Sequence, residues 1–149
     1  MVAKHDAAQG SLMAQLKARR VRKTYQALVQ GSVAASVGRI EAPIGRDPKH
    51  RTRMAVVPDG RASTTGYRVR ERFAEWTLLE LDLVTGRTHQ IRVHLAAIGH
   101  PLVGDPVYGA RRTATGVPAF ARQALHAQRL AFVHPVTHCA ISFASPLPA

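Results

Sequence analysis

The chain has 149 residues, a length that fits one domain with a sizeable core and little room for a second. Lysine and arginine number 21 against 9 aspartates and glutamates, so the formal net charge is +12. This excess favours a polyphosphate partner such as nucleic acid, although a solvated basic surface would give the same count. No apolar segment resembles a secretion signal or is long enough to span a membrane. The single Cys139 excludes an internal disulfide and favours a reducing, cytoplasmic compartment.

The first part of the chain predicts a short strand, a helix and a longer strand. Residues 1–4 are β-like, and residues 7–20 carry apolar side chains at helical spacing. Residues 21–31 alternate between polar and apolar side chains, which predicts a strand with Tyr25 on the face of the small apolar residues.

The middle of the chain predicts a loop followed by two strands. Residues 42–66 are rich in proline and glycine and predict a loop with one short strand near 54–57. Residues 65–73 and 76–84 alternate as strands do. Antiparallel pairing would bring arginines of the first opposite acidic residues of the second, namely Arg70 or Arg72 opposite Glu80 or Asp82.

A run of cations and polar residues occupies residues 86–94, which read Gly-Arg-Thr-His-Gln-Ile-Arg-Val-His. The apolar spacing predicts a helix over 88–97, with Thr88 as N-cap and Gly99 at its C-terminus. Its basic and imidazole side chains are suited to anionic or polyhydroxylic groups; they are Arg87, His89, Arg92 and His94.

The last part predicts a tight turn at 104–109, a loop with a weak helix over 110–123, and closing strands over 125–133 and 140–144. The predicted fold class is therefore α+β, with a mixed, mostly antiparallel sheet and a few helices.

Several segments, in this order, resemble the motifs of one enzyme family. They are Lys-Thr-Tyr-Gln-Ala-Leu-Val-Gln-Gly at 23–31, Ala-Pro-Ile-Gly-Arg at 42–46, Met-Ala-Val at 54–56, the run at 86–94, His-Pro-Leu-Val-Gly-Asp-Pro-Val-Tyr-Gly at 100–109, and Gln-Ala-Leu-His-Ala at 123–127. The chain resembles the RluA/RluD family of pseudouridine synthases, and most closely the RluD type that modifies large-subunit ribosomal RNA. The resemblance implies a pseudouridine synthase catalytic-domain fold that lacks its N-terminal part. Residues 1–149 would form the C-terminal portion of one catalytic domain, without a separate second domain.

The resemblance also implies an activity and two site residues. The family isomerises uridine to pseudouridine in RNA and needs no cofactor. Arg92 is then expected to hold the nucleophilic carboxylate ionised and oriented. Tyr25 is expected to lie against the flipped uracil and to take the proton from C5. The alternatives are a surface arginine near a helix end and an ordinary core tyrosine.

The family's nucleophilic aspartate has no counterpart in this sequence. It stands in an Arg-Leu-Asp run, followed by Thr-Ser-Gly, shortly before the segment that residues 1–4 resemble. Asp6 fits charge compensation at a helix start, and Asp105 fits a turn in which it bonds its own backbone. Two alternatives therefore stay open: a truncated, noncatalytic RNA-binding remnant, and a basic ribosome-associated structural protein that shares only the fold.

RNA contacts are expected from two groups of cations. Arg87 and His89 lie where a helix N-terminus favours phosphate. A denser basic run is either a phosphate track or a solvated helix end, and comprises Lys17, Arg19, Arg20, Arg22 and Lys23. The eight histidines lack two tight ligand pairs, so no metal site is expected. The expected state is a monomer bound to large-subunit ribosomal RNA.

Overall fold

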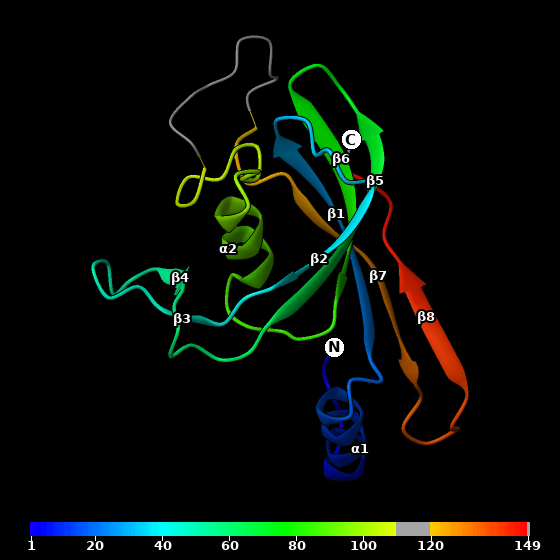
Figure 1. The fold of residues 1–149 in the computed structure, drawn as a ribbon. Helices are drawn as coiled ribbons and strands as arrows, with labels where there is room; N and C mark the ends of the chain where they lie inside the picture. Colours follow the sequence, from blue (N-terminus) through cyan, green and yellow to red (C-terminus); the bar gives the residue numbers. More distant parts are fainter. Residues whose placement is uncertain (110–119, 149) are drawn as a thin grey trace.

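The computed structural model describes residues 1–109 and 120–148. Its elements are α1 (Asp6–Lys17), β1 (Arg22–Gln30), β2 (Val37–Glu41), β3 (Ile44–Arg46), β4 (Met54–Val56), β5 (Thr64–Arg72), β6 (Trp76–Leu83), α2 (Gln90–Ala97), β7 (Leu125–Val133) and β8 (Ala140–Ala144). Six strands form one sheet in the order β2-β5-β6-β1-β7-β8, and β3 pairs with β4 in a separate hairpin (Figure 1). Each pair of neighbouring strands is antiparallel. The predicted α+β class is confirmed.

The core lies between α2 and the central strands β1 and β6. Ala27 of β1 is in register with Leu79 of β6, and both are at most 1% exposed. They belong to one apolar cluster with Ile91 and Leu95 of α2. Burying one large aliphatic side chain contributes about 1.5–3 kcal/mol. Because the packing of Ile91 and Leu95 fixes α2 on the middle of the sheet, it also fixes where the polar side chains of α2 begin.

Helix α1 lies apart from α2, below the sheet in Figure 1. One amide joins it to the end of β7: Gln15 Nε2 donates to the Val133 carbonyl at 2.8 Å, and Gln15 Oε1 accepts the Val133 N–H at 2.9 Å. Ala8 and Leu12 are buried, whereas Leu16 is 42% exposed. The helix ends at Lys17, three residues earlier than predicted.

The strand predicted over residues 1–4 is wrong. Residues 1–3 have no regular secondary structure, and His5 is the N-cap of α1. Val2 is 91% exposed, and no described strand pairs with this segment. Without ladder hydrogen bonds, a β-like composition does not hold the chain extended.

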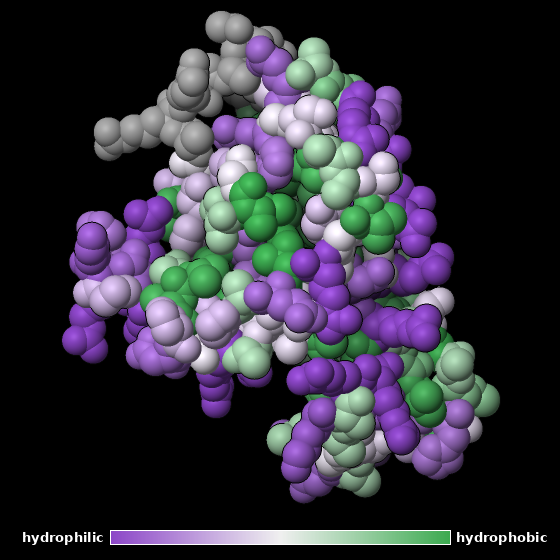
Figure 2. All heavy atoms as spheres, viewed as in Figure 1, coloured by the Kyte–Doolittle hydropathy of each residue, from purple (hydrophilic) through white to green (hydrophobic). Residues whose placement is uncertain are grey.

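The loop predicted over 42–66 contains more structure than expected. Its short strand is confirmed as β4, but β3 pairs with it and β2 precedes the segment. The hairpin turn is held by Asp47, whose Oδ1 accepts the N–H groups of Lys49 and His50. Strand β2 lies at the sheet edge with one buried residue, Ile40, so its apolar pattern is weak. Figure 2 shows hydrophilic side chains over the β3–β4 hairpin, beside a more apolar central surface.

The two strands predicted after this loop are confirmed as β5 and β6, which pair antiparallel. The expected ion pair between them is present, since Arg70 donates to Glu80. It is largely exposed on the arginine side, with 48% of that side chain accessible. The loop and weak helix predicted over 110–123 lie mostly outside the described residues.

Candidate active site

A buried amide fixes the turn that leads into α2. Gln90 is 2% exposed. Its Oε1 accepts the Thr85 hydroxyl at 2.8 Å and the Arg87 N–H at 3.0 Å, while its Nε2 donates to the Thr64 carbonyl at 2.9 Å and the Thr65 hydroxyl at 3.0 Å. Because all four bonding positions of the amide are used, the turn and β5 are held in one arrangement.

His94, one turn further along α2, is also structural. It is 0% exposed; its Nε2 lies 3.0 Å from the Ala42 carbonyl and its Nδ1 lies 2.9 Å from the Thr65 hydroxyl. Burial lowers the pKa of His94, an effect that the hydrogen bond to Ala42 opposes. Neutral His94 then donates from Nε2 and accepts at Nδ1. The expectation that His94 meets a substrate group is wrong, because no part of it reaches the surface.

Helix α2 begins at Gln90, with His89 as its N-cap. The prediction of Thr88 as N-cap is wrong, because the N-cap lies one residue later. The Gln90 N–H bonds the Arg87 carbonyl at 3.1 Å and closes a tight turn over residues 87–90. His89 adopts the left-handed conformation, with φ 56°. A non-glycine residue in this conformation costs roughly 1–2 kcal/mol. Gly99, also at positive φ, follows the last residues of the helix as predicted.

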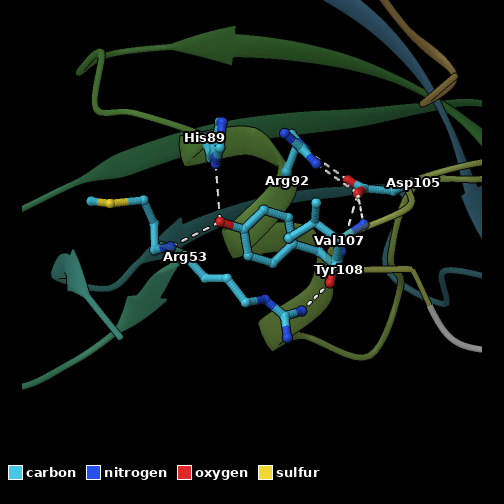
Figure 3. A network of polar contacts seen from close by, with 7 residues as sticks. Arg53, His89, Arg92, Asp105, Val107 and Tyr108 are labelled. Carbon is cyan, nitrogen blue, oxygen red and sulfur yellow. Dashed lines mark hydrogen bonds and ion pairs between the residues drawn. The ribbon is translucent and has the colours of Figure 1, made fainter. Parts of the chain in front are cut away.

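Arg92 is paired with Asp105 on the turn after α2 (Figure 3). Its Nε donates to Oδ2 and its Nη2 to Oδ1, both at 2.8 Å. The Asp105 side chain is 0% exposed and that of Arg92 is 12% exposed. The hydrogen bond to Asp105 raises the pKa of Arg92 despite burial. Arg92 is therefore charged, directed by a carboxylate of this chain, and reached by solvent over a small area.

Asp105 also bonds its own turn, as the sequence predicts. Its Oδ1 accepts the N–H of Val107 at 2.9 Å and of Tyr108 at 3.0 Å. Burial pushes the pKa of Asp105 upward, but the bonds from Arg92, Tyr108 and Val107 outweigh it, so the pKa lies below its usual 3.8. A buried carboxylate with both oxygens occupied is a poor nucleophile.

The Tyr108 ring lies between two guanidinium groups, as Figure 3 shows. The Arg92 Cζ is 4.9 Å and the Arg53 Cζ 5.5 Å from its centroid. Arg53 also donates to the Val107 carbonyl. The Tyr108 hydroxyl accepts the Met54 N–H at 2.9 Å, so the β3–β4 hairpin is joined to the turn that follows α2.

The Tyr108 hydroxyl also lies 3.0 Å from Nδ1 of His89. Burial, and then the charge of Arg92, lower the pKa of His89, while Asp105 opposes them. Neutral His89 accepts a hydrogen bond from the Tyr108 O–H at Nδ1 and carries its own proton on Nε2. It is an exposed hydrogen-bond donor beside the start of α2.

Arg87 follows Gly86 in the chain, and Lys23 lies close to Gly86 in space. A Cβ built on Gly86 would be 3.5 Å from the Lys23 Nζ. Arg87 Nη2 reaches the Ala62 carbonyl at 3.4 Å, and its buried Nε has no hydrogen-bond partner within the described residues. The proximity of Lys23 to Gly86 places the start of β1 beside the turn that precedes α2.

Tyr25 lines a pocket of about 470 Å³ on the sheet. The pocket wall combines polar and apolar side chains from five parts of the chain: Met1, Leu16, Lys23, Tyr25, Ala127, Gln128, Arg129, Leu130, Phe143, Ala144 and Ser145. Burial raises the pKa of Tyr25, so its phenol is protonated at neutral pH. Arg92 does not line this pocket, and the sharing of one cleft by Tyr25 and Arg92 stays a prediction.

The remaining predicted RNA-binding residues are exposed where α1 ends and β1 begins: Arg19, Arg20 and Arg22. Arg19 has a φ of 57°, at the point where the chain leaves the helix. No group of three or more metal-ligating side chains occurs in the described part of the chain. None of its helices is long and apolar enough to cross a membrane.

Two residues of the Arg92 surroundings were not anticipated from the sequence. Tyr108 stands in the turn motif at 104–109, and Arg53 directly precedes β4. Tyr108 lies within a visible motif, whereas Arg53 lies just outside the motif at 54–56, and their contact depends on the folding of the hairpin against α2. A tyrosine three residues after an aspartate in a short turn was the available signal.

The chain matches the family model described as RNA pseudouridylate synthase over residues 1–97. It is 54% identical to an RNA pseudouridine synthase of Chloroflexus aurantiacus, covering 100% of this chain and 46% of that protein. It is 52% identical to ribosomal large subunit pseudouridine synthase D of Nitrosomonas europaea, covering 99% of this chain and 44% of that protein. The solved human RNA pseudouridylate synthase domain containing 1 has a TM-score of 0.83 at 34% identity, covering 99% of this chain and 63% of that one.

The chain therefore belongs to the RNA pseudouridylate synthase family, and its resemblance to the RluD type is confirmed. It spans about half the length of the curated relatives it matches.

Proposed function

We propose that residues 1–149 form the C-terminal portion of one catalytic domain of an RluD-type enzyme that converts uridine to pseudouridine in large-subunit ribosomal RNA. The observation that supports this most strongly is the extent of the match. Relatives that are 52–54% identical cover at least 99% of this chain, while the chain covers only 44–46% of them. The nucleophilic aspartate then comes from the other half of the domain.

Arg92 is the residue that meets this aspartate. The carboxylate attacks C1′ of the uridine as the bond to N1 of the base breaks, and C5 of the rotated base then bonds to C1′ as the carboxylate leaves. A carboxylate must be ionised to do this, and a guanidinium beside it favours the ionised form. Nη1 of Arg92 has no partner among the described residues and is free for this bond.

Tyr25 supports the flipped base. Its ring is exposed to a pocket large enough to receive a nucleobase, in keeping with sequestration of the base from the stack. Its phenol is protonated at neutral pH. The phenol gives its own proton to water as its oxygen accepts the proton from C5, and N1 of the base takes up a proton from water.

The RNA backbone is bound by cations, and by the His89 hydrogen-bond donor, around these two residues. Lys23, Arg87 and His89 lie close to the start of α2, and Arg19, Arg20 and Arg22 extend the basic surface from the end of α1. The reaction redistributes bonds within one nucleotide, so it requires no cofactor. The enzyme acts as a monomer in the cytoplasm, on large-subunit ribosomal RNA.

The proposal is tested by joining this chain to the N-terminal half of the Chloroflexus aurantiacus relative. The joined protein should form pseudouridine in a ribosomal RNA fragment, whereas residues 1–149 alone should bind the RNA without converting it. Arg92→Lys in the joined protein should lose most activity, because an ammonium does not reproduce the planar, paired donors of a guanidinium. An inactive joined protein that is folded and binds RNA would contradict the proposal, as would conversion by residues 1–149 alone.

A further inference from the structure

We propose that Asp105 is a positioning residue: it holds one edge of Arg92 so that the opposite edge meets the nucleophilic carboxylate. This inference rests on the proposed function. It assigns a role to a carboxylate that is too buried to react and is bonded to the arginine expected in the site.

The geometry of the guanidinium is the first argument. Its five N–H groups lie in one plane, so fixing two of them fixes the direction of the others. Asp105 occupies Nε and one hydrogen of Nη2. The edge formed by Nη1 and the second hydrogen of Nη2 is left, and that edge has the shape to pair both oxygens of a second carboxylate.

The rigidity of Asp105 is the second argument. Its carboxylate is completely buried and also accepts the N–H groups of Val107 and Tyr108. The Tyr108 ring faces the guanidinium at 4.9 Å, and its hydroxyl is held by the Met54 N–H. Arg92 is therefore bound at one edge and covered on one face by groups that are themselves fixed.

The charge of the Arg92–Asp105 pair distinguishes orienting the nucleophilic carboxylate from simply attracting it. Asp105 opposes the positive charge of Arg92 through a direct ion pair, and the other polar groups against the pair are Tyr108, neutral His89 and, beyond the ring, Arg53. A guanidinium already paired with one carboxylate attracts a second anion less strongly than an unpaired guanidinium does, but it still orients that anion. Direction is what a displacement at C1′ requires, since small misplacements of reacting groups cost large factors in rate.

Asp105→Asn tests this with little change of shape. The amide oxygen in the place of Oδ1 still accepts the backbone N–H groups of the turn, but an NH₂ replaces Oδ2, the oxygen that accepts the Arg92 Nε–H. In residues 1–149, the Arg92 Nε–H resonance, assigned by its loss in Arg92→Lys, should exchange with water at least about tenfold faster in the variant. In the joined protein, kcat should fall roughly 10–100-fold with KM changed less than about threefold. Glu80→Gln, which removes the carboxylate of the Arg70 pair, is the matched control and should change neither.

The outcomes separate the two proposals. An unchanged Arg92 resonance in Asp105→Asn overturns the positioning role, and so does faster exchange combined with parental kcat. If the parent joined protein is inactive, the proposed function fails, while faster exchange in the variant still supports the holding of Arg92 by Asp105. Should Asp105→Asn not fold, Tyr108→Leu replaces it; faster Arg92 exchange with lower kcat supports the held geometry, and parental values for both overturn it.

Discussion

The surroundings of Arg92 and those of Tyr25 differ in how their side chains are held. Arg92 is bonded twice to a buried carboxylate and faces a ring whose hydroxyl is also bonded. Tyr25 lies on a strand of the same sheet but opens into a pocket of about 470 Å³. Under the proposed function, the rigid surroundings of Arg92 direct the reacting groups and the open pocket at Tyr25 receives the base.

The largest expected effect comes from breaking the rigid part. Arg92→Ala in residues 1–149 should lower the free energy of unfolding by about 3–5 kcal/mol, because it leaves the buried charge of Asp105 without a partner. Arg70→Ala, which breaks the more exposed pair with Glu80, should cost less than about 1 kcal/mol. Urea denaturation of both variants measures the difference. Equal losses would contradict the buried, rigid character of the Arg92 pair.

A smaller effect on stability should follow from protonating His94, which helps to hold α2 in place. The pKa of buried His94 is lowered, so the unfolded chain binds the proton more readily than the folded chain. Stability from neutral His94 is fully present above its ordinary pKa of 6.5 and declines as the pH falls from there toward the folded value. His94→Gln should flatten this decline, although His89 leaves part of it. A decline between pH 7 and pH 5 that is identical in parent and variant would be the contrary result.

RNA binding by the exposed arginines at the end of α1 and the start of β1 should depend on the salt concentration. Replacing Arg19, Arg20 and Arg22 together by glutamine should weaken RNA binding about tenfold in low salt and reduce the slope of log affinity against log salt by about one for each lost phosphate contact. Fluorescence anisotropy over a range of salt concentrations provides both values. The matched control replaces Arg39, Arg68 and Arg70, cations of β2 and β5. If the two triple variants behave alike, the basic surface has no preferred track.

The smallest effect is expected at Tyr25. Tyr25→Phe keeps the ring that receives the base, so RNA affinity and stability should change little. In the joined protein, cleavage of the glycosidic bond should be spared more than release of the finished product, because the proton transfer follows the cleavage. Single-turnover measurements with one RNA distinguish the two steps. A larger loss in cleavage than in release would assign the hydroxyl to an earlier step.

Much of the fold could be predicted because its periodic segments are long. Strands β1, β5 and β6 alternate over eight or nine residues, and the apolar positions of α2 repeat at helical spacing. Strands β2 and β3 could not be predicted, since one is a short edge strand and the other is held by its pairing with β4.

The sequence nominates the residues of the candidate site, whose roles stay predictions, but it does not give their contacts. Arg92 and Tyr25 stand out through their motifs, and the turn bonds of Asp105 follow from its local sequence. The Arg92–Asp105 pair spans 13 residues and depends on the packing of α2, while Arg53 reaches Tyr108 through a hairpin that was itself only partly foreseen. The burial of His94 was missed because the sequence does not show that Ala42 covers its side of α2.

The neutral character of the Arg92 pair has a consequence for how the protein's cations should be counted. Ions that condense on RNA are displaced by cations that approach its phosphates, and a guanidinium already matched by a buried carboxylate displaces few of them. Arg92 then adds almost nothing to the ionic-strength dependence of binding, although it is one of the chain's 17 arginines. Under the proposed function, ionic strength therefore acts on the binding of the RNA by the exposed cations, while Arg92 responds to it little.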